Sequence, residues 1–214
     1  MQDRPPVRVV YEDPDFVVVE KASGFLSVPG RGPEKRDCVC ARVRDLYPDC
    51  IPNPEVHRLD MDTSGLMVVA LKVDSQRNLS EQFRLRRTRK RYTALLDGRL
   101  EGERGTIELR FRLDLENRPR QIHDAENGKL GITHWERVSI ESGVTRVAFV
   151  PVTGRTHQLR VHAAHDLGLG IPIVGDPLYG GGTGPAQLKL HACELGFQHP
   201  RTGEKLDFDS TPPF

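Results

Sequence analysis

The chain has 214 residues, of which 37% are hydrophobic and 29% charged, and its formal net charge is +1. This composition fits a folded globular protein better than a disordered chain, and apolar runs such as FVVVE and LMVVAL are far too short to span a bilayer. The N-terminus lacks the basic-then-apolar pattern of a secretory signal, so we expect a cytoplasmic protein without a membrane segment.

The first predicted element is a β-hairpin, because VRVVYED and FVVVEK flank the turn residues Asp-Pro-Asp at 13–15. Residues 23–37 contain five Gly and Pro residues and no periodicity, which predicts a loop. The loop ends at Asp37, a candidate N-cap for a helix that runs through Leu46 and is terminated by Pro48.

Strand and helix patterns alternate in the next part of the chain. GLMVVALK, residues 65–72, predicts a strand, and Asp74 can cap a following helix over 75–86. RKRYTALLDGRL, residues 89–100, is β-rich, and GTIELRFRL, residues 105–113, alternates as a strand does.

The last part of the chain begins with a turn-rich connection over 117–129. Residues 132–140 and 145–153 then predict an antiparallel pair of strands. The segment TGRTHQLRVHAAHDLG predicts a helix with three apolar residues on neighbouring turns: Leu159, Ala163 and Leu167. The glycine-rich residues 175–185 precede a strand over 188–197.

Strands outnumber helices in this series, and many neighbouring strands are joined as hairpins. We therefore expect an α+β fold with a mostly antiparallel, mixed central sheet and flanking helices and loops. The length suits a single domain over residues 1–214, or one domain divided into two lobes.

A basic segment covers Gln76–Tyr92, where seven basic residues face one acid, Glu81, for a local charge of +6. Six of the basic residues fall within eight positions: Arg84, Arg86, Arg87, Arg89, Lys90 and Arg91. Such a cluster suits the phosphates of a nucleic acid. The alternative is a solvated helix face.

The segment HRLDMDTSGL places two carboxylates, Asp60 and Asp62, directly before an apolar strand. Asp62 fits an Asx-turn or cap. Asp60 stands between two apolar residues at the start of that strand, so its carboxylate needs a cation or hydrogen-bond donors. Arg58, Arg155 and Arg160 are candidate partners, and an ionised aspartate in a dry pocket can act as a nucleophile or stabilise a charge.

Three histidines are spaced H-x4-H-x2-H at His157, His162 and His165, without the HExxH pattern of a zinc enzyme. We expect surface or core histidines and no metal site. The glycine-rich segment lacks the Lys-Ser or Lys-Thr of a phosphate loop, and Ser64 is not in a GxSxG elbow, so neither nucleotide binding nor a serine hydrolase is favoured.

Six segments considered together are similar to those of a known family. VVVEKASGFLSVPG, HRLDMDTSGL, KRYTALLDG, PVTGRTHQLRVH, GDPLYG and LKLHA resemble, in this order, the motifs of the RluA-type pseudouridine synthases. The resemblance spans nearly the whole chain. It implies the two-lobed pseudouridine synthase fold and the isomerisation of uridine to pseudouridine in RNA, with no metal or other cofactor.

The resemblance also implies roles for individual residues. Asp60 matches the catalytic aspartate, Tyr92 the tyrosine that stacks on the target base, and Arg160 the arginine that forms a salt bridge to the aspartate. Leu190 matches an apolar residue that packs against the base, and Arg58 stands where a basic side chain could touch RNA.

Two departures from the family pattern concern RNA binding and the first motif. The chain has EKASG where members often have NKPAG, and we expect no N-terminal S4 domain, because the first predicted hairpin begins close to residue 1. Binding would then fall to the catalytic domain, with five basic residues as the platform: Arg84, Arg86, Arg87, Arg89 and Lys90. The short branch without an S4 domain implies a monomer that modifies a large-subunit ribosomal RNA uridine and an anticodon-loop uridine of transfer RNA.

Two rival functions are considered. One is a catalytically silent RNA-binding module of the same fold, which predicts loss of Asp60, Tyr92 or Arg160, although all three are present. The other is a metal-dependent hydrolase that uses the histidine cluster with Asp60 and Asp62, and it predicts activity that a chelator removes.

Overall fold

The computed structural model describes residues 7–214, which divide into two compact units. The first unit comprises residues 7–90 and Ala192–Pro213, and the second comprises Arg91–His191 and Phe214. Residues 1–6, which begin the segment considered for a secretory signal, lie outside the described residues. Among residues 7–214, no helix combines the length and apolar character needed to cross a membrane.

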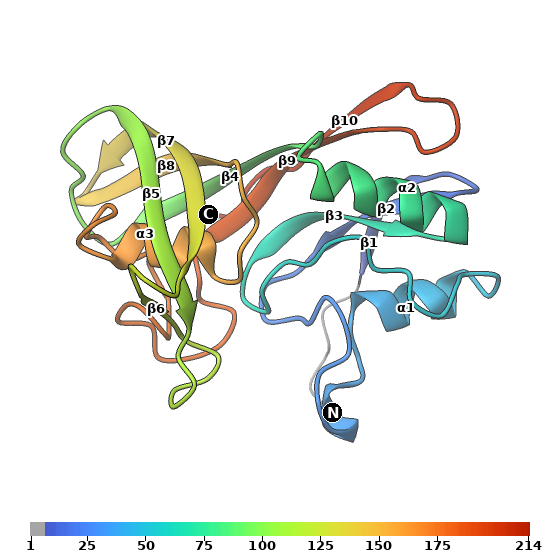
Figure 1. The fold of residues 1–214 in the computed structure, drawn as a ribbon, viewed down its shortest axis with the longest axis horizontal. Helices are drawn as coiled ribbons and strands as arrows, with labels where there is room; N and C mark the ends of the chain where they lie inside the picture. The colour runs from blue at the N-terminus through green and yellow to red at the C-terminus, as the bar shows by residue number, and fades with distance from the viewer. Residues whose placement is uncertain (1–6) are drawn as a thin grey trace. The chain divides into compact units, whose positions relative to one another are not determined.

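The elements follow one another in an α+β arrangement (Figure 1). In chain order they are β1 (Arg8–Glu12), β2 (Phe16–Lys21), the 3-10 helix η1 (Pro33–Lys35), α1 (Val39–Leu46), β3 (Ser64–Ala70), α2 (Val73–Arg84), β4 (Arg89–Leu96), β5 (Arg104–Leu113), β6 (Gln121–His123), β7 (Lys129–Glu141), β8 (Val144–Pro151), α3 (Gln158–Ala164), β9 (Leu190–Gln198) and β10 (Lys205–Asp209). The mostly antiparallel sheet and the few helices confirm the predicted fold class.

The first unit is built on the predicted hairpin. β1, β2 and β3 are antiparallel neighbours, β9 follows β3 in strand order, and β10 pairs antiparallel with β9. All of Phe16, Val17, Val18 and Val19 are fully buried, so both faces of β2 are covered. The ribbon shows α1 and α2 on opposite sides of these strands (Figure 1), and Leu79 of α2 packs into the core. The short strand β10 was not predicted.

The second unit is an antiparallel sheet in the order β4, β8, β7, β5, β6. The pair β7 and β8 confirms the predicted strands over 132–153, and the connection over 117–129 contains the unpredicted strand β6. The helix α3 contributes Leu159 and Ala163 to a core that also contains Phe149 of β8. The apolar side of α3 therefore holds the GRTHQLRVH segment against the sheet.

Two predicted helix caps are wrong. The N-cap of α1 is Cys38, not Asp37, whose carboxylate is paired with Arg42 at 2.7 Å. The helix α2 begins at Val73, so Asp74 lies inside the first turn. An acid in the first turn is stabilised by the helix dipole, which explains why Asp74 could be mistaken for the cap.

The predicted continuation of α3 to Leu167 is also wrong. The helix ends at Ala164, because His165 takes an extended conformation with φ of −76° and ψ of 141°. The Leu169 N–H then returns to the carbonyl of His162 at 2.9 Å. Leu167 is left 64% exposed, although its spacing matches the apolar side of the helix.

Candidate active site

Asp60 lies in a turn directly before β3 in the first unit. The N–H of Thr63 donates to the Asp60 carbonyl at 3.1 Å and closes the turn. The Asp60 residue is half-buried, whereas Asp62 is 6% exposed. The two acids therefore have different environments, as a turn predicts, and Asp60 is the more accessible of the two.

Gly65 fixes how β3 leaves this turn. Its φ is +115°, and a Cβ at this position would stand 2.4 Å from the carbonyl oxygen of Ala192 in β9. Any side chain would collide with the backbone of the neighbouring strand. The glycine of the TSG sequence is thus required by a close backbone approach next to the Asp60 turn.

The ammonium of Lys21 holds the Asp60 turn from below the surface. The side chain is 1% exposed and donates to three carbonyl groups, those of Met61 at 2.7 Å, Phe25 at 2.7 Å and Ala22 at 3.0 Å. Met61 lies between the two aspartates of the motif. A buried lysine with all three protons used ties the end of β2 to the Asp60 turn.

Burial lowers the pKa of Lys21 to about 7. The charges of the nearby Asp60 and Asp62 carboxylates act in the opposite direction and are outweighed. Near neutral pH, the charge under the turn can therefore change. Burying the ammonium costs desolvation free energy. The hydrogen bonds to the carbonyls and the two neighbouring negative charges offset this cost.

Two serines from the segment after β2 complete the support of the turn. The Ser23 hydroxyl donates to the Asp62 carbonyl at 2.6 Å, and the Ser27 hydroxyl donates to the Leu59 carbonyl at 2.7 Å. Ser27 also accepts from the Leu59 N–H at 3.1 Å. The loop predicted over 23–37 is therefore a scaffold for the motif that carries Asp60.

His57 anchors the start of the same motif. Its ring stacks on Phe83 of α2 at 4.3 Å between centroids and 15° between planes, and its Nε2 accepts from the Val68 N–H at 3.2 Å. Burial lowers the pKa of His57 to about 3, and the charge of Lys90 lowers it further. His57 is a neutral structural group rather than an acid or base of the reaction.

Arg160 is buried in the second unit and has a carboxylate partner there. Its Nε and Nη2 donate to Oδ2 and Oδ1 of Asp176 at 2.8 and 2.7 Å. Burial by itself would raise the pKa of Asp176, but the hydrogen bonds and charge of Arg160 and the N–H groups of Leu178 and Tyr179 outweigh it, and the pKa is lowered. The further salt bridge to Asp60, expected from the resemblance, stays a prediction.

Tyr92 and Leu190 meet at one core cluster of the second unit. Leu190 is 2% exposed and belongs to the cluster, and Tyr92, opposite Phe149 on the paired strand β8, packs against it while staying half-buried. The structure thus brings these two predicted site residues together. Arg58, in the first unit, is exposed.

The basic segment divides into paired and unpaired side chains. Arg84 is paired with Glu81, and Arg89 is paired with Glu194 and Asp207. Two other exposed arginines, Arg86 and Arg87, form no salt bridge among residues 7–214, although the charge of Arg87 helps to lower the pKa of Glu81 after the larger effect of Arg84. Lys90 is half-buried, and burial, with the charge of Arg86, lowers its pKa. Positive charge that is not in a salt bridge is therefore confined to fewer residues than the sequence suggests.

Comparison with known proteins shows the origin of this arrangement. The family model described as RNA pseudouridylate synthase matches residues 15–165. The chain belongs to this family. It is 44% identical over 214 residues to the "Dual-specificity RNA pseudouridine synthase RluA" of Pasteurella multocida, covering 98% of this chain and 95% of that protein. The protein of the same name from Escherichia coli K12 is 41% identical over 210 residues, with 96% and 93% covered.

A solved structure supports the same assignment. "Human RNA Pseudouridylate Synthase Domain Containing 1" is 30% identical with a TM-score of 0.78, covering 100% of this chain and 87% of that one. The resemblance to RluA-type pseudouridine synthases is confirmed, and the protein is an RNA pseudouridine synthase, an isomerase. The catalytically silent alternative is not supported.

The histidine cluster of this pseudouridine synthase does not assemble. His162 is fully buried with both ring nitrogens unpartnered, and burial lowers its pKa to about 4. His157 hydrogen-bonds to Tyr179, and His165 accepts from a backbone N–H two residues on. The expectation of structural histidines holds for these three, and the rival hydrolase has no geometric support among the described residues.

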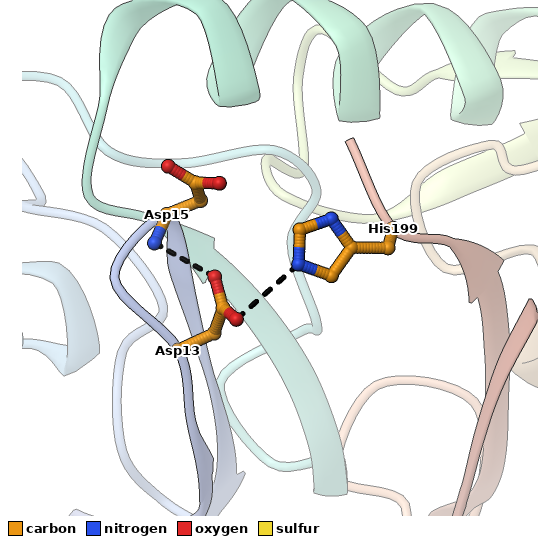
Figure 2. Close-up of side chains that lie close together, drawn as sticks. All are labelled: Asp13, Asp15 and His199. Atoms are coloured by element: carbon orange, nitrogen blue, oxygen red, sulfur yellow. Dashed lines mark hydrogen bonds and ion pairs between the residues drawn. The ribbon is translucent and has the colours of Figure 1, made fainter. Parts of the chain in front are cut away.

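Another group of possible metal ligands, which no sequence motif indicated, lies between two turns of the first unit: Asp13, Asp15 and His199 (Figure 2). Nδ1 of His199 accepts from the N–H groups of Arg201 at 3.1 Å and Thr202 at 3.2 Å, so Nε2 carries the proton and donates to Asp13 at 3.2 Å. Asp15 pairs with Arg201 at 2.9 Å. The hydrogen bonds favour a tie between turns over a metal site.

This interpretation predicts that dialysis against EDTA leaves the unfolding temperature of the protein unchanged. The Asp13→Ala substitution, in contrast, is expected to lower the free energy of unfolding by about 1–2 kcal/mol, because a mostly buried hydrogen bond is lost. Thermal unfolding with EDTA, with added Mg²⁺ and with added Zn²⁺ checks both statements. Metal stabilisation of the parent that disappears in Asp13→Ala would instead identify a cation site.

Proposed function

We propose that this enzyme isomerises specific uridines in stem-loops of large-subunit ribosomal RNA, transfer RNA or both, with Asp60 as the catalytic group. The observation that carries the proposal is the Asp60 turn, in which Lys21, Ser23 and Ser27 bind the backbone carbonyls on either side of a half-buried aspartate. Two relatives at 44% and 41% identity are named as dual-specificity RNA pseudouridine synthases, which supports more than one class of RNA substrate.

The proposed reaction requires only groups that the chain supplies. The bond between C1′ of the ribose and N1 of uracil breaks, the uracil turns and C1′ bonds to C5. The proton of C5 is released to water, and N1, which leaves with the bonding electrons, takes up a proton. The Asp60 carboxylate attacks the ribose or the base, or assists proton loss from the ribose. Tyr92 stacks on the uracil and can transfer a proton, Leu190 packs against the base, and Arg160 forms a salt bridge to the Asp60 carboxylate.

The target base must leave its stack to reach these groups. Unstacking costs a few kcal/mol and is least for bases that are not well paired, so loop uridines are the favoured targets. Phosphates are held by exposed basic side chains, and specificity comes from RNA shape and splayed bases. Arg58, exposed beside the motif, is assigned a contact near the flipped nucleotide.

The enzyme is proposed to act as one catalytic domain and as a monomer, because all residues assigned to the reaction come from a single chain. Its proposed location is the cytoplasm, where ribosomal and transfer RNA are found. No metal, nucleotide or redox group is assigned a role, since the isomerisation involves no net oxidation or hydrolysis.

The function is tested by tritium release. Purified protein is incubated, without metal or cofactor, with RNA labelled with tritium at C5 of uridine, and the Asp60→Asn variant serves as the control. Release of tritium to water by the parent alone supports the proposal, and mapping then identifies the nucleotide. If neither protein releases tritium from transfer RNA or ribosomal RNA, these RNAs are not substrates and the proposal fails.

The division of the basic segment predicts unequal effects on RNA binding. Replacing Arg86 and Arg87 together by Gln is expected to reduce the slope of log affinity against log salt by about 2, or about 1 for each phosphate that is no longer bound. The matched control replaces Arg84 and Arg89 by Gln, because these arginines are already paired with acids. Binding titrations at several salt concentrations compare the two. An equal decrease of slope in both variants would place the platform along the whole segment.

A further inference from the structure

Arg160 is enclosed by side chains of the GDPLYG segment, to which no role in the reaction has yet been assigned. Asp176 binds the guanidinium through two parallel hydrogen bonds of 2.8 and 2.7 Å, and the side chains are 3% and 0% exposed. Two parallel bonds fix both the position and the plane of a guanidinium. The Arg160 side chain therefore has one orientation within its unit.

Asp176 is itself held in place. Its Oδ1 also accepts from the N–H groups of Leu178 at 2.9 Å and Tyr179 at 3.0 Å. The carboxylate thus caps its own turn and orients Arg160 at the same time. A buried ion pair is in general a weak source of stability, because the desolvation of both charges offsets their attraction. Orientation of the arginine is the better explanation for retaining two buried charges here.

Tyr179 covers the same guanidinium with its ring. The central carbon of Arg160 lies 5.2 Å from the ring centroid, a cation–π distance. The Tyr179 hydroxyl accepts from the Gln121 N–H at 2.7 Å and shares a second hydrogen bond, of 2.9 Å, with Nδ1 of His157. These two bonds fix the rotation of the ring over Arg160.

The backbone at His157, next to the contact between Tyr179 and Arg160, has an uncommon conformation. His157 is 8% exposed and has a φ of +56°, a left-handed conformation that is uncommon for residues other than glycine. It lies three residues before Arg160 and serves as the N-cap of α3. Such backbone strain persists only where surrounding contacts hold it, and the Tyr179 hydroxyl supplies one of them.

We propose that Asp176 and Tyr179 are positioning residues that fix the guanidinium of Arg160 for its part in catalysis. The inference rests on the proposed function, in which Arg160 acts on Asp60. An unrestrained arginine has many rotamers and would have to be ordered in every turnover, whereas Asp176 and Tyr179 order it in advance. Because Arg160 is assigned to the catalytic carboxylate rather than to RNA, its misplacement affects the chemical step and not substrate binding.

The test compares Asp176→Asn, Tyr179→Leu and Tyr179→Phe in tritium release at saturating and limiting RNA. We expect Asp176→Asn to lower kcat about 10- to 100-fold with KM changed less than about threefold. Tyr179→Leu, which removes the ring, is expected to lower kcat about tenfold, and Tyr179→Phe, which keeps the ring, less than Tyr179→Leu.

Asp124→Asn is the matched control. Asp124 also pairs with an arginine, Arg112, and also accepts from two backbone N–H groups of its turn, but it makes no contact with Arg160 among the described residues. This variant is expected to keep the kcat and the KM of the parent. A general effect of removing a turn-capping carboxylate would appear in both aspartate variants.

The outcomes separate the two hypotheses. An inactive parent, or an active Asp60→Asn variant, refutes the proposed function. If the parent is active and Asp60→Asn is not, then folded Asp176→Asn and Tyr179→Leu variants with kcat within about twofold of the parent refute the positioning role alone. If Asp176→Asn does not fold, the two Tyr179 variants decide, because Tyr179 is only half-buried.

Discussion

An Asp60→Asn variant is expected to lose at least about 10³-fold in kcat while RNA affinity changes little. Asparagine has the shape of aspartate, so the Asp60 turn, which is held through the backbone carbonyls of Leu59, Met61 and Asp62, keeps its geometry. The amide, however, is neither a nucleophile nor a base at neutral pH. The substitution therefore removes the chemistry and leaves the fold.

The measurement is single-turnover tritium release with enzyme in excess over RNA, so that slow product release does not mask the chemical step. Filter binding of the same RNA and the unfolding temperature of the variant show whether binding and fold are intact. An Asp60→Asn variant that retains more than about a tenth of the parent rate would assign the reaction to another group. Equal loss of rate and of affinity would indicate instead that Asp60 binds RNA.

The elements that could be predicted from the sequence are those determined by local patterns. The hairpin of β1 and β2 has two alternating or fully apolar runs around an Asp-Pro-Asp turn, and the pair β7 and β8 has a similar signature. The helix ends were less predictable, because Cys38 caps α1 although Asp37 is the better capping residue by type. The Asp37 carboxylate binds Arg42 in place of the helix N-terminus, and no sequence pattern indicates that these two interactions compete.

The motifs of the candidate site could be predicted from the sequence, but the side chains that hold these motifs in place could not. The residues themselves indicated Asp60 and its candidate partner Arg160, whereas Tyr92 and Leu190 came from the resemblance. The partners of the Asp60 turn are backbone carbonyls, which every residue has, so no sequence pattern indicates that Lys21 binds them. One signal was present: Lys21 ends a strand whose first four residues are all apolar, and a lysine in such a strand needs partners if the strand is buried.

The contacts around Arg160 were missed for another reason. Asp176 and Tyr179 lie 16 and 19 residues after Arg160, beyond the range of helix or strand periodicity. The glycines of their segment indicate a turn and give no sign of an ion pair. A buried arginine in an apolar helix needs a carboxylate partner, and Asp176 is the nearest acid in the other motifs.

A Lys21→Met variant is expected to lower the free energy of unfolding at pH 7 by about 2–4 kcal/mol. Methionine has a similar length but leaves the carbonyls of Ala22, Phe25 and Met61 without their donor. Methionine avoids the desolvation cost of the ammonium, but it leaves three buried carbonyls without a donor. The second effect is the larger one, because the ammonium makes three hydrogen bonds at once. Lys205→Met, at an exposed lysine of β10, is the matched control and should have little effect.

The pH dependence of this difference makes the prediction specific to Lys21. With the folded-state pKa lowered to about 7 from an ordinary 10.5, the unfolded chain binds more protons than the folded one between these values. The free energy of unfolding of the parent therefore rises with pH over this interval, by up to about 1.4 kcal/mol per pH unit, relative to Lys21→Met. Below pH 7 the lysine is protonated in both states and contributes no slope.

Urea titrations of the parent, Lys21→Met and Lys205→Met at about pH 6, 7, 8.5 and 10 measure this directly. The gap between the parent and Lys21→Met should widen over the upper part of this range, whereas the gap to Lys205→Met should not. A gap independent of pH would mean that the Lys21 amine keeps an ordinary affinity for protons when folded. The hydrogen bonds to the three carbonyls would then offset the whole desolvation cost of the ammonium. Lys21 would stay positively charged beside the Asp60 turn at neutral pH.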